Sequence, residues 1–219
     1  MRNSPISGLY AVTPETSDDD WLGARVAAVL AGGARVLQYR SKCADARARR
    51  RQADRLLGLC RAHRALLIIN DDVDLARELG ADGVHLGRED LLPAAARAAL
   101  GDQALVGVSC YDSLERARAA QAQGADYVAF GSFFASAVKP QAVRAPLELL
   151  RSARGVLALP LVAIGGITAQ NGQALIEAGA DALAVISALF EVPDSAAAAQ
   201  ALVALFAPRN PPSSPEPDA

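Results

Sequence analysis

The chain has 219 residues, of which 52% are hydrophobic and 21% charged, and its formal net charge is −2. This length suits a sizeable core, while the near-neutral charge and the few aromatic residues argue against a nucleic-acid partner. No apolar signal core opens the sequence and no run of 18 apolar residues follows, so we expect no membrane partner. Three cysteines without a CxxC pair indicate reduced thiols and a cytoplasmic protein.

Strand-like runs alternate with Ala- and Arg-rich helical stretches, as is typical of a parallel α/β fold. Helices are expected near Trp21–Ala31, then in an arginine-rich stretch ending near Arg64, and after each later strand. Eight strands, each with a following helix, predict a (β/α)₈ TIM barrel rather than an open sheet. The expected strands are Gly8–Thr13, Arg35–Arg40, Leu66–Ile69, Val84–Leu86, Leu105–Cys110, Tyr127–Gly131, Leu159–Gly165 and Leu183–Ile186.

A repeated Gly-Ala-Asp or Gly-Ala-Arg turn supports a closed barrel, because it precedes each even-numbered strand. Its copies begin at Gly33, Gly80, Gly124 and Gly179. The glycine is expected to end a helix in the left-handed conformation. Alternatively, the triplet is a common helix-to-strand turn, and the strand count alone supports a barrel. We predict one barrel domain over residues 1–206 and a disordered, proline-rich tail over residues 207–219.

Acidic residues follow the third and fourth expected strands. Because parallel strands point the same way, Asp71 and Asp90 should emerge at the same edge, where they could share one cation. The alternative is helix capping: Asp71 or Asp72 could cap the helix that begins near Val73, and Asp90 the helix near Pro93. Neighbouring cations favour the metal interpretation.

Those cations follow the second and sixth strands. Alternation along the second strand places Gln38, Arg40 and Lys42 on one side, and Lys139 lies in the loop after the sixth strand. Cations beside a carboxylate pair suit a Mg²⁺-bound pyrophosphate, since Mg²⁺ takes one or two carboxylates together with phosphate oxygens.

A second anion site is expected after the last two strands. The seventh strand ends in Gly165-Gly166, where backbone amides can approach a ligand, and the eighth ends in Ile186-Ser187 before a short helical turn. These loops form the usual phosphate site of the barrel. Ser109 lies in GVSC, which lacks the GxSxG pattern of a nucleophile, and we expect His85 to be structural.

The segments GLYAVT, QYRSK, IIND, GVHLGRED, GVS, SFFASAVK, VAIGGI and AVIS resemble, in order and spacing, the thiamine phosphate synthase family. The resemblance covers about residues 8–206. It implies a TIM barrel that couples a hydroxymethylpyrimidine diphosphate to a thiazole phosphate, giving thiamine phosphate and pyrophosphate, with Mg²⁺ as cofactor.

The resemblance also implies a set of site residues. It makes Asp71 and Asp90 the Mg²⁺ ligands. The QYRSK segment (Gln38, Tyr39, Arg40, Ser41 and Lys42), Asn70, Ser109 and Lys139 would hold the pyrimidine diphosphate. Catalytic contacts would come from Arg40, Lys42, Lys139 and Ser109. The thiazole phosphate would be bound by Gly166, Ile186 and Ser187, with Ser136 close to the thiazole.

The sequence departs from the family pattern at Val138, where a threonine is usual, and at Asp72 and Arg88. Two alternative functions therefore stand beside the synthase: a paralogue that isomerises the thiazole phosphate, and a catalytically silent barrel that binds a phosphorylated metabolite. The paralogue should not need the cations together with the acid pair. The sequence leaves a homo-oligomer open.

Overall fold

A computed structural model describes residues 5–135 and 144–207. Its strands form a closed barrel in the order β1 to β8, with β8 paired to β1 and every neighbouring pair parallel. The predicted TIM barrel is therefore confirmed. The strands are β1 Gly8–Val12, β2 Val36–Tyr39, β3 Leu66–Asn70, β4 Gly83–Leu86, β5 Leu105–Tyr111, β6 Tyr127–Phe130, β7 Leu161–Ile164 and β8 Ala182–Val185.

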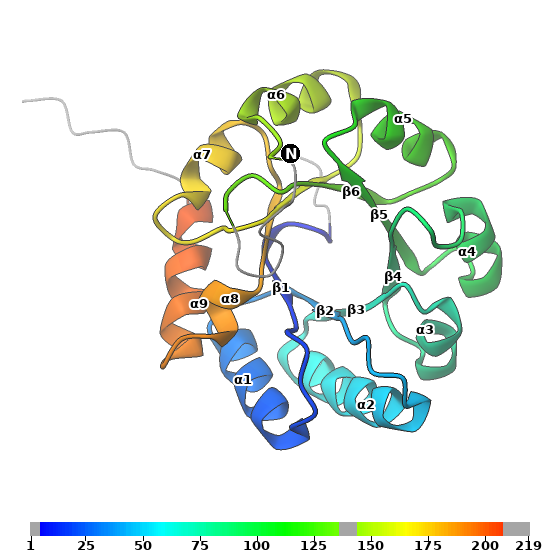
Figure 1. Ribbon diagram of the computed structural model, residues 1–219, viewed down its shortest axis with the longest axis vertical. Helices are drawn as coiled ribbons and strands as arrows, with labels where there is room; N and C mark the ends of the chain where they lie inside the picture. The colour runs from blue at the N-terminus through cyan, green and yellow to red at the C-terminus, as the bar shows by residue number, and fades with distance from the viewer. Residues whose placement is uncertain (1–4, 136–143, 208–219) are drawn as a thin grey trace, which may run out of the picture.

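Helices surround the barrel as an outer ring (Figure 1). They are α1 Asp19–Ala31, α2 Ala46–His63, α3 Val73–Leu79, α4 Pro93–Leu100, α5 Leu114–Ala122, α6 Leu147–Val156, α7 Gly172–Glu177, α8 Ser187–Phe190 and α9 Ser195–Val203, followed by the 3₁₀ turn η1 Ala204–Phe206. Within the described ranges, no helix is long and apolar enough to cross a membrane.

Most strand boundaries lie within one residue of the sequence-based expectation, and two elements begin two residues away from it. The seventh strand begins at Leu161, two residues later than predicted, because Pro160 has no N–H to donate to the ladder. The first helix begins at Asp19, since the side chain of Asp18 accepts hydrogen bonds from the next turn and caps it. The tail predicted from residue 207 lies outside the described residues, apart from Ala207.

The Gly-Ala-Asp turns clamp pairs of strands together. Asp82 accepts a hydrogen bond from the backbone N–H of Leu67 at 2.7 Å, and its own N–H donates to the Leu67 carbonyl at 3.0 Å. Asp126 and Asp181 repeat both bonds at the starts of β5 and β7. The preceding glycines all have positive φ, as predicted. The repeat thus fixes the register at the end of the barrel away from the strand C-termini.

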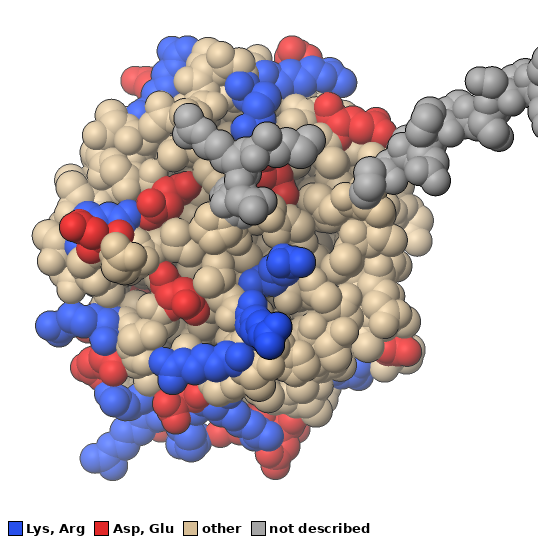
Figure 2. Space-filling model, turned by 180° about the vertical axis from the view of Figure 1, so that it is seen from behind, with Lys and Arg blue, Asp and Glu red and all other residues tan. Residues whose placement is uncertain are grey.

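Buried side chains pack on both faces of the barrel sheet. One buried cluster lies between the strands and the helices, and a second, smaller one lies within the barrel. The inner cluster includes Tyr10, Val36, Ile68 and Tyr127. On the face opposite to that of Figure 1, basic and acidic side chains are interspersed (Figure 2). The inner cluster forms the base on which the candidate site is built.

Candidate active site

A cavity of about 420 Å³ opens among the C-terminal ends of the strands, where barrel active sites lie. All eight strands or the loops after them contribute to its wall. The lining residues are Tyr10, Val12, Gln38, Arg40, Asn70, His85, Arg88, Ser109, Tyr111, Asp112, Ala129, Gly131, Ser132, Val162, Ile164, Gly165, Ala184 and Ile186. Five of the predicted substrate-binding residues, Gln38, Arg40, Asn70, Ser109 and Ile186, therefore line one cavity.

The predicted acid pair converges beside this cavity. The pKa of Asp71 is raised to about 6, first by partial burial and then by a hydrogen bond with Asp90 and the charge of Asp90, against the opposite effects of Asn70 and Arg40. The other carboxylate is fixed by the Gly87 N–H, which donates to Asp90 Oδ2 at 2.6 Å. Two carboxyl groups held this close repel each other unless a proton or a cation lies between them.

Capping does not account for these two acids. The residue that caps α3 is Asp72, whose Oδ1 accepts from the Leu75 N–H at 2.9 Å. The N-cap of α4 is Leu92, without a side-chain bond, so Asp90 caps no helix either. Asp71 itself has φ = 64°, a left-handed conformation that turns its side chain away from the helix it precedes. The metal interpretation is the one that this geometry favours.

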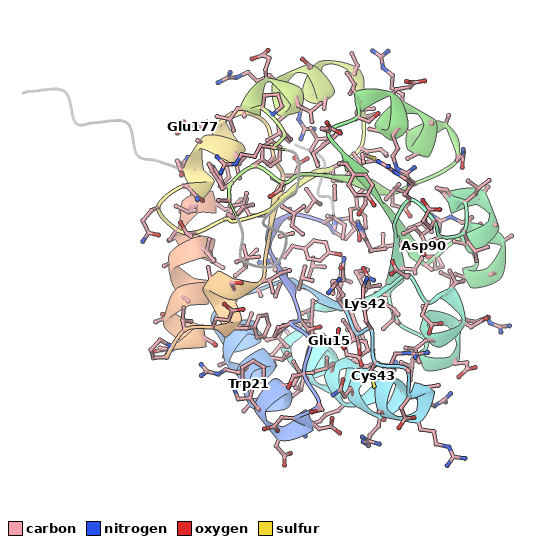
Figure 3. All side chains as sticks on the ribbon, in the orientation of Figure 1. Glu15, Trp21, Lys42, Cys43, Asp90 and Glu177 are labelled. Atoms are coloured by element: carbon pink, nitrogen blue, oxygen red, sulfur yellow. The ribbon has the colours of Figure 1, made fainter. Side chains whose placement is uncertain are left out.

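The cations of the QYRSK segment are positioned by the loop after β1. Thr13 Oγ1 accepts from the Arg40 N–H at 2.9 Å, which fixes the backbone where Arg40 enters the cavity wall. Glu15 accepts from the Lys42 N–H at 2.8 Å and from Ser41 Oγ at 3.2 Å. Lys42 and Asp90 lie at the rim of the central opening, on the loops after β2 and β4 (Figure 3). The cations and the acids thus share one rim.

Tyr39 faces the other way. Its hydroxyl donates to Gln52 Oε1 at 2.8 Å, so the ring lies between β2 and α2. Together with Ser41 and Asp71 it lines a separate hollow of about 250 Å³ next to the main cavity. Ser136, Val138 and Lys139 lie outside the described residues. Arg88 stacks on Tyr111, 4.8 Å from the ring centroid, and lines the cavity.

A second pocket of about 200 Å³ adjoins the first between the ends of β7 and β8, and Gly165, Gly166, Ile186 and Ser187 line it. The two glycines have φ of 109° and 63°, and a Cβ on Gly166 would lie 2.2 Å from the Ala135 carbonyl oxygen. Ser187 Oγ is buried and has no hydrogen-bond partner among the described residues. The buried Ser187 hydroxyl can donate a hydrogen bond to an anionic ligand in this pocket.

Three residues that sequence reasoning did not assign to the site lie at its base: Tyr10, His85 and Tyr127. Burial lowers the pKa of His85 to about 4, so the ring is neutral at pH 7. Its Nε2 lies 2.9 Å from Ser109 Oγ and its Nδ1 lies 3.1 Å from the Tyr127 hydroxyl. The sequence signal that could have identified them is a polar residue at an inward-facing position in the middle of a strand.

A closed parallel barrel with a cavity among the C-terminal ends of its strands, and with acids and cations beside that cavity, is the architecture of a TIM-barrel enzyme. Residues 9–189 match the family described as thiamine monophosphate synthase. The thiamine-phosphate synthase of Chromobacterium violaceum is 58% identical over 93% of this chain and 98% of its own, and that of Thiobacillus denitrificans is 56% identical over 94% and 98%. The chain belongs to the thiamine monophosphate synthase family.

A solved structure agrees with this assignment. The thiamine phosphate pyrophosphorylase from Pyrococcus furiosus superposes with a TM-score of 0.81 at 34% sequence identity, covering 90% of this chain and 94% of that one. The family and this structural likeness together identify an enzyme of the transferase class in thiamine biosynthesis.

Proposed function

We propose that this protein condenses 4-amino-2-methyl-5-hydroxymethylpyrimidine diphosphate with a thiazole phosphate to form thiamine phosphate and pyrophosphate. In this reaction the C–O bond to the diphosphate breaks and a C–N bond to the thiazole nitrogen forms. The observation that carries the proposal is the contact between Asp71 and Asp90, together with the charge of Arg40 acting on Asp71 from the wall of the main cavity. The family assignment supports it independently.

We assign the acid pair to a magnesium ion. The raised pKa of Asp71 supports this assignment, because a bound cation reduces the repulsion between two ionised carboxylates. Asp71 and Asp90 would hold Mg²⁺, which when bound supplies compensation for charge on the departing diphosphate. Arg40, Lys42 and Lys139 would bind the same anion, and each preorganised partner of this kind is worth about 10²-fold or more in rate.

The remaining residues would bind and orient the two organic substrates. Gln38, Asn70 and Ser109, which line the main cavity, would hold the pyrimidine end. The pocket formed by Gly166, Ile186 and Ser187 would receive the thiazole phosphate, with Ser136 near its ring. Tyr39 and Ser41 would support Arg40 and Lys42 from the adjoining hollow. The two pockets share Ile164, Gly165, Ala184 and Ile186, so bound substrates would meet at that common wall.

We also place the reaction in the cytoplasm, since Cys43, Cys60 and Cys110 are all free thiols.

The direct test is incubation of purified protein with both substrates and Mg²⁺, followed by measurement of pyrophosphate and thiamine phosphate. We expect equal amounts of both products. A paralogue that isomerises the thiazole phosphate would change that substrate alone, and a silent barrel would bind without turnover. Failure to release pyrophosphate under these conditions contradicts the proposal.

A further inference from the structure

A continuous chain of hydrogen bonds crosses the interior of the barrel from Gln38 to Ser109. It passes through the hydroxyls of Tyr10 and Tyr127 and through both nitrogens of His85, and we call it the interior chain. Its contacts are Gln38 Nε2 to Tyr10 OH at 2.9 Å, Tyr10 OH to Tyr127 OH at 2.9 Å, Tyr127 OH to His85 Nδ1 at 3.1 Å, and His85 Nε2 to Ser109 Oγ at 2.9 Å.

The surrounding barrel is shaped to hold this chain. Tyr127 is fully buried, and Tyr10 and His85 are 1% and 7% exposed. The His85 ring stacks on Tyr127 with centroids 5.5 Å apart. Gly107 on β5 leaves the space that the Tyr127 ring occupies, since a Cβ there would lie 2.0 Å from the Tyr127 Cζ. Polar groups buried this deeply need their partners, so the chain behaves as one unit.

In one direction of the interior chain, each tyrosine hydroxyl accepts one hydrogen bond and donates one. Gln38 Nε2 donates to Tyr10, and Tyr10 donates to Tyr127. Tyr127 donates to His85 Nδ1, and the neutral imidazole carries its proton on Nε2 and donates to Ser109. This direction leaves the carbonyl oxygen and the second N–H of Gln38 and the hydroxyl proton of Ser109 outside the interior chain.

The direction of the interior chain sets what Ser109 offers to a ligand. When Tyr127 donates to His85 Nδ1, Ser109 accepts from His85 Nε2 and offers its proton; in the reverse direction, Ser109 donates to His85 and offers a lone pair. While Gln38 Nε2 donates to Tyr10, the Gln38 carbonyl oxygen is an acceptor that the interior chain does not use. With Ser109 as donor, this pair complements a ligand with an amino donor and an unprotonated ring nitrogen.

We propose that Tyr127 and His85 are specificity-determining positioning residues, which set Gln38 as the acceptor for the amino group of an aminopyrimidine and Ser109 as the donor to its ring nitrogen. This inference rests on the proposed function for the identity of the substrate. A 4-oxo pyrimidine diphosphate, with a carbonyl oxygen and a protonated ring nitrogen, presents the opposite pattern and would require the whole chain to reverse.

The kinetic test compares kcat/KM for the 4-amino and 4-oxo pyrimidine diphosphates in the wild type and in Tyr127→Phe, which interrupts the chain in its middle. We expect the preference for the amino substrate to fall about 10-fold or more, through KM for the pyrimidine, with KM for the thiazole phosphate unchanged. Cys110→Ala changes a buried side chain of β5 in the cluster between strands and helices, outside the cavity and the interior chain, and should keep the wild-type preference. An unchanged preference in Tyr127→Phe overturns the inference; if that variant does not fold, Tyr10→Phe replaces it.

The spectroscopic test does not depend on turnover. The protein contains two histidines, His63 and His85. Comparison of the ¹⁵N NMR spectra of the wild type and of His63→Gln therefore identifies the signals of the His85 ring nitrogens. We expect the Nε2-protonated tautomer in the wild type and a shift of the tautomer populations in Tyr127→Phe. An Nδ1-protonated His85 in the wild type overturns the proposed direction. Absence of pyrophosphate release with the expected tautomer would instead contradict the proposed function alone.

Discussion

Asp71 and Asp90 follow two adjacent strands, β3 and β4, and their carboxyl groups meet in a hydrogen bond that raises the pKa of Asp71. The backbone reinforces the contact, because the Asp71 N–H donates to the His85 carbonyl on β4 at 2.9 Å. Neither acid caps a helix, so the barrel maintains an electrostatically unfavourable pair at the rim of its cavity. Such a pair is a candidate site for a divalent cation.

Asp71→Asn should lower kcat by about 10²-fold or more, because it removes one carboxylate from the proposed metal site. Asparagine tolerates the φ of 64° at this position, so the fold should remain intact. With EDTA present, the unfolding midpoint at pH 7.5 should rise, since the repulsion with Asp90 is removed. Circular dichroism and pyrophosphate release measure the two effects.

The matched control is Asp72→Asn on the neighbouring residue. Asparagine caps a helix about as well as aspartate, so α3 and the activity should both be close to wild type. An Asp71→Asn enzyme that turns over at the wild-type rate in excess Mg²⁺ would remove the metal assignment.

The closed barrel could be predicted because each strand is a continuous apolar run and each Gly-Ala-Asp turn marks where a helix gives way to a strand. The choice between capping and metal binding at Asp71 and Asp90 could not, because both require an acid at the end of a strand. It depends on the left-handed backbone of Asp71 and on which carboxylate reaches the Leu75 N–H. Sequence spacing contains neither fact.

The interior chain could not be predicted from the sequence for a related reason. The position of His85 in the middle of a strand predicts a structural role, and its side chain is buried. What connects it to Ser109 and Tyr127 is the stagger of β4, β5 and β6, together with the missing Cβ of Gly107. These are long-range contacts that inward-facing polar residues indicate only once the register is known.

Gly166→Ala should raise KM for the thiazole phosphate about 10-fold or more. The new Cβ would meet the Ala135 carbonyl oxygen at 2.2 Å, and the φ of 63° is unfavourable for alanine, so the backbone lining the second pocket must shift. Gly58→Ala is the control, because Gly58 lies within α2 with nothing near its Cβ position. That variant should gain about 0.5–1 kcal/mol of stability. Equal KM values in the two variants would contradict the placement of the phosphate.

Ser187→Ala should separate binding from stability. Loss of a hydrogen bond to a charged phosphate is expected to weaken binding of the thiazole phosphate roughly 10-fold to 100-fold. The ligand-free protein should lose almost nothing, because Ser187 Oγ has no partner among the described residues. Ser195→Ala provides the contrast: its Oγ donates to the Leu189 carbonyl at 2.6 Å, and the change should cost about 1–3 kcal/mol of stability. A Ser187→Ala protein with wild-type affinity would exclude the hydroxyl from the site.

The stability of the protein should depend on pH because His85 is buried in its neutral form. The pKa of His85 is about 4 in the folded protein and about 6.5 in the unfolded chain, so the unfolded state takes up its proton first as the pH falls. The free energy of unfolding should therefore decrease from about pH 6.5 to pH 4, by about 3 kcal/mol from this group. Protonation of Asp71, whose pKa is raised to about 6, changes stability in the opposite sense over the same range, so the contribution of His85 is measured as a difference between variants. In denaturant titrations in EDTA, the stability of the wild type and of His63→Gln should fall more, or rise less, between pH 6.5 and pH 4 than that of His85→Gln. Identical slopes in all three would mean that His85 is not held neutral.

The most direct test of the account is a crystal structure obtained with pyrophosphate and Mn²⁺ in place of Mg²⁺. We expect an anomalous peak within about 2.0–2.3 Å of one oxygen from each of Asp71 and Asp90, with pyrophosphate oxygens completing its coordination and Arg40 in contact with the same anion. Manganese bound elsewhere, or a pyrophosphate held without either carboxylate, would contradict the central claim that this acid pair and these cations form one site.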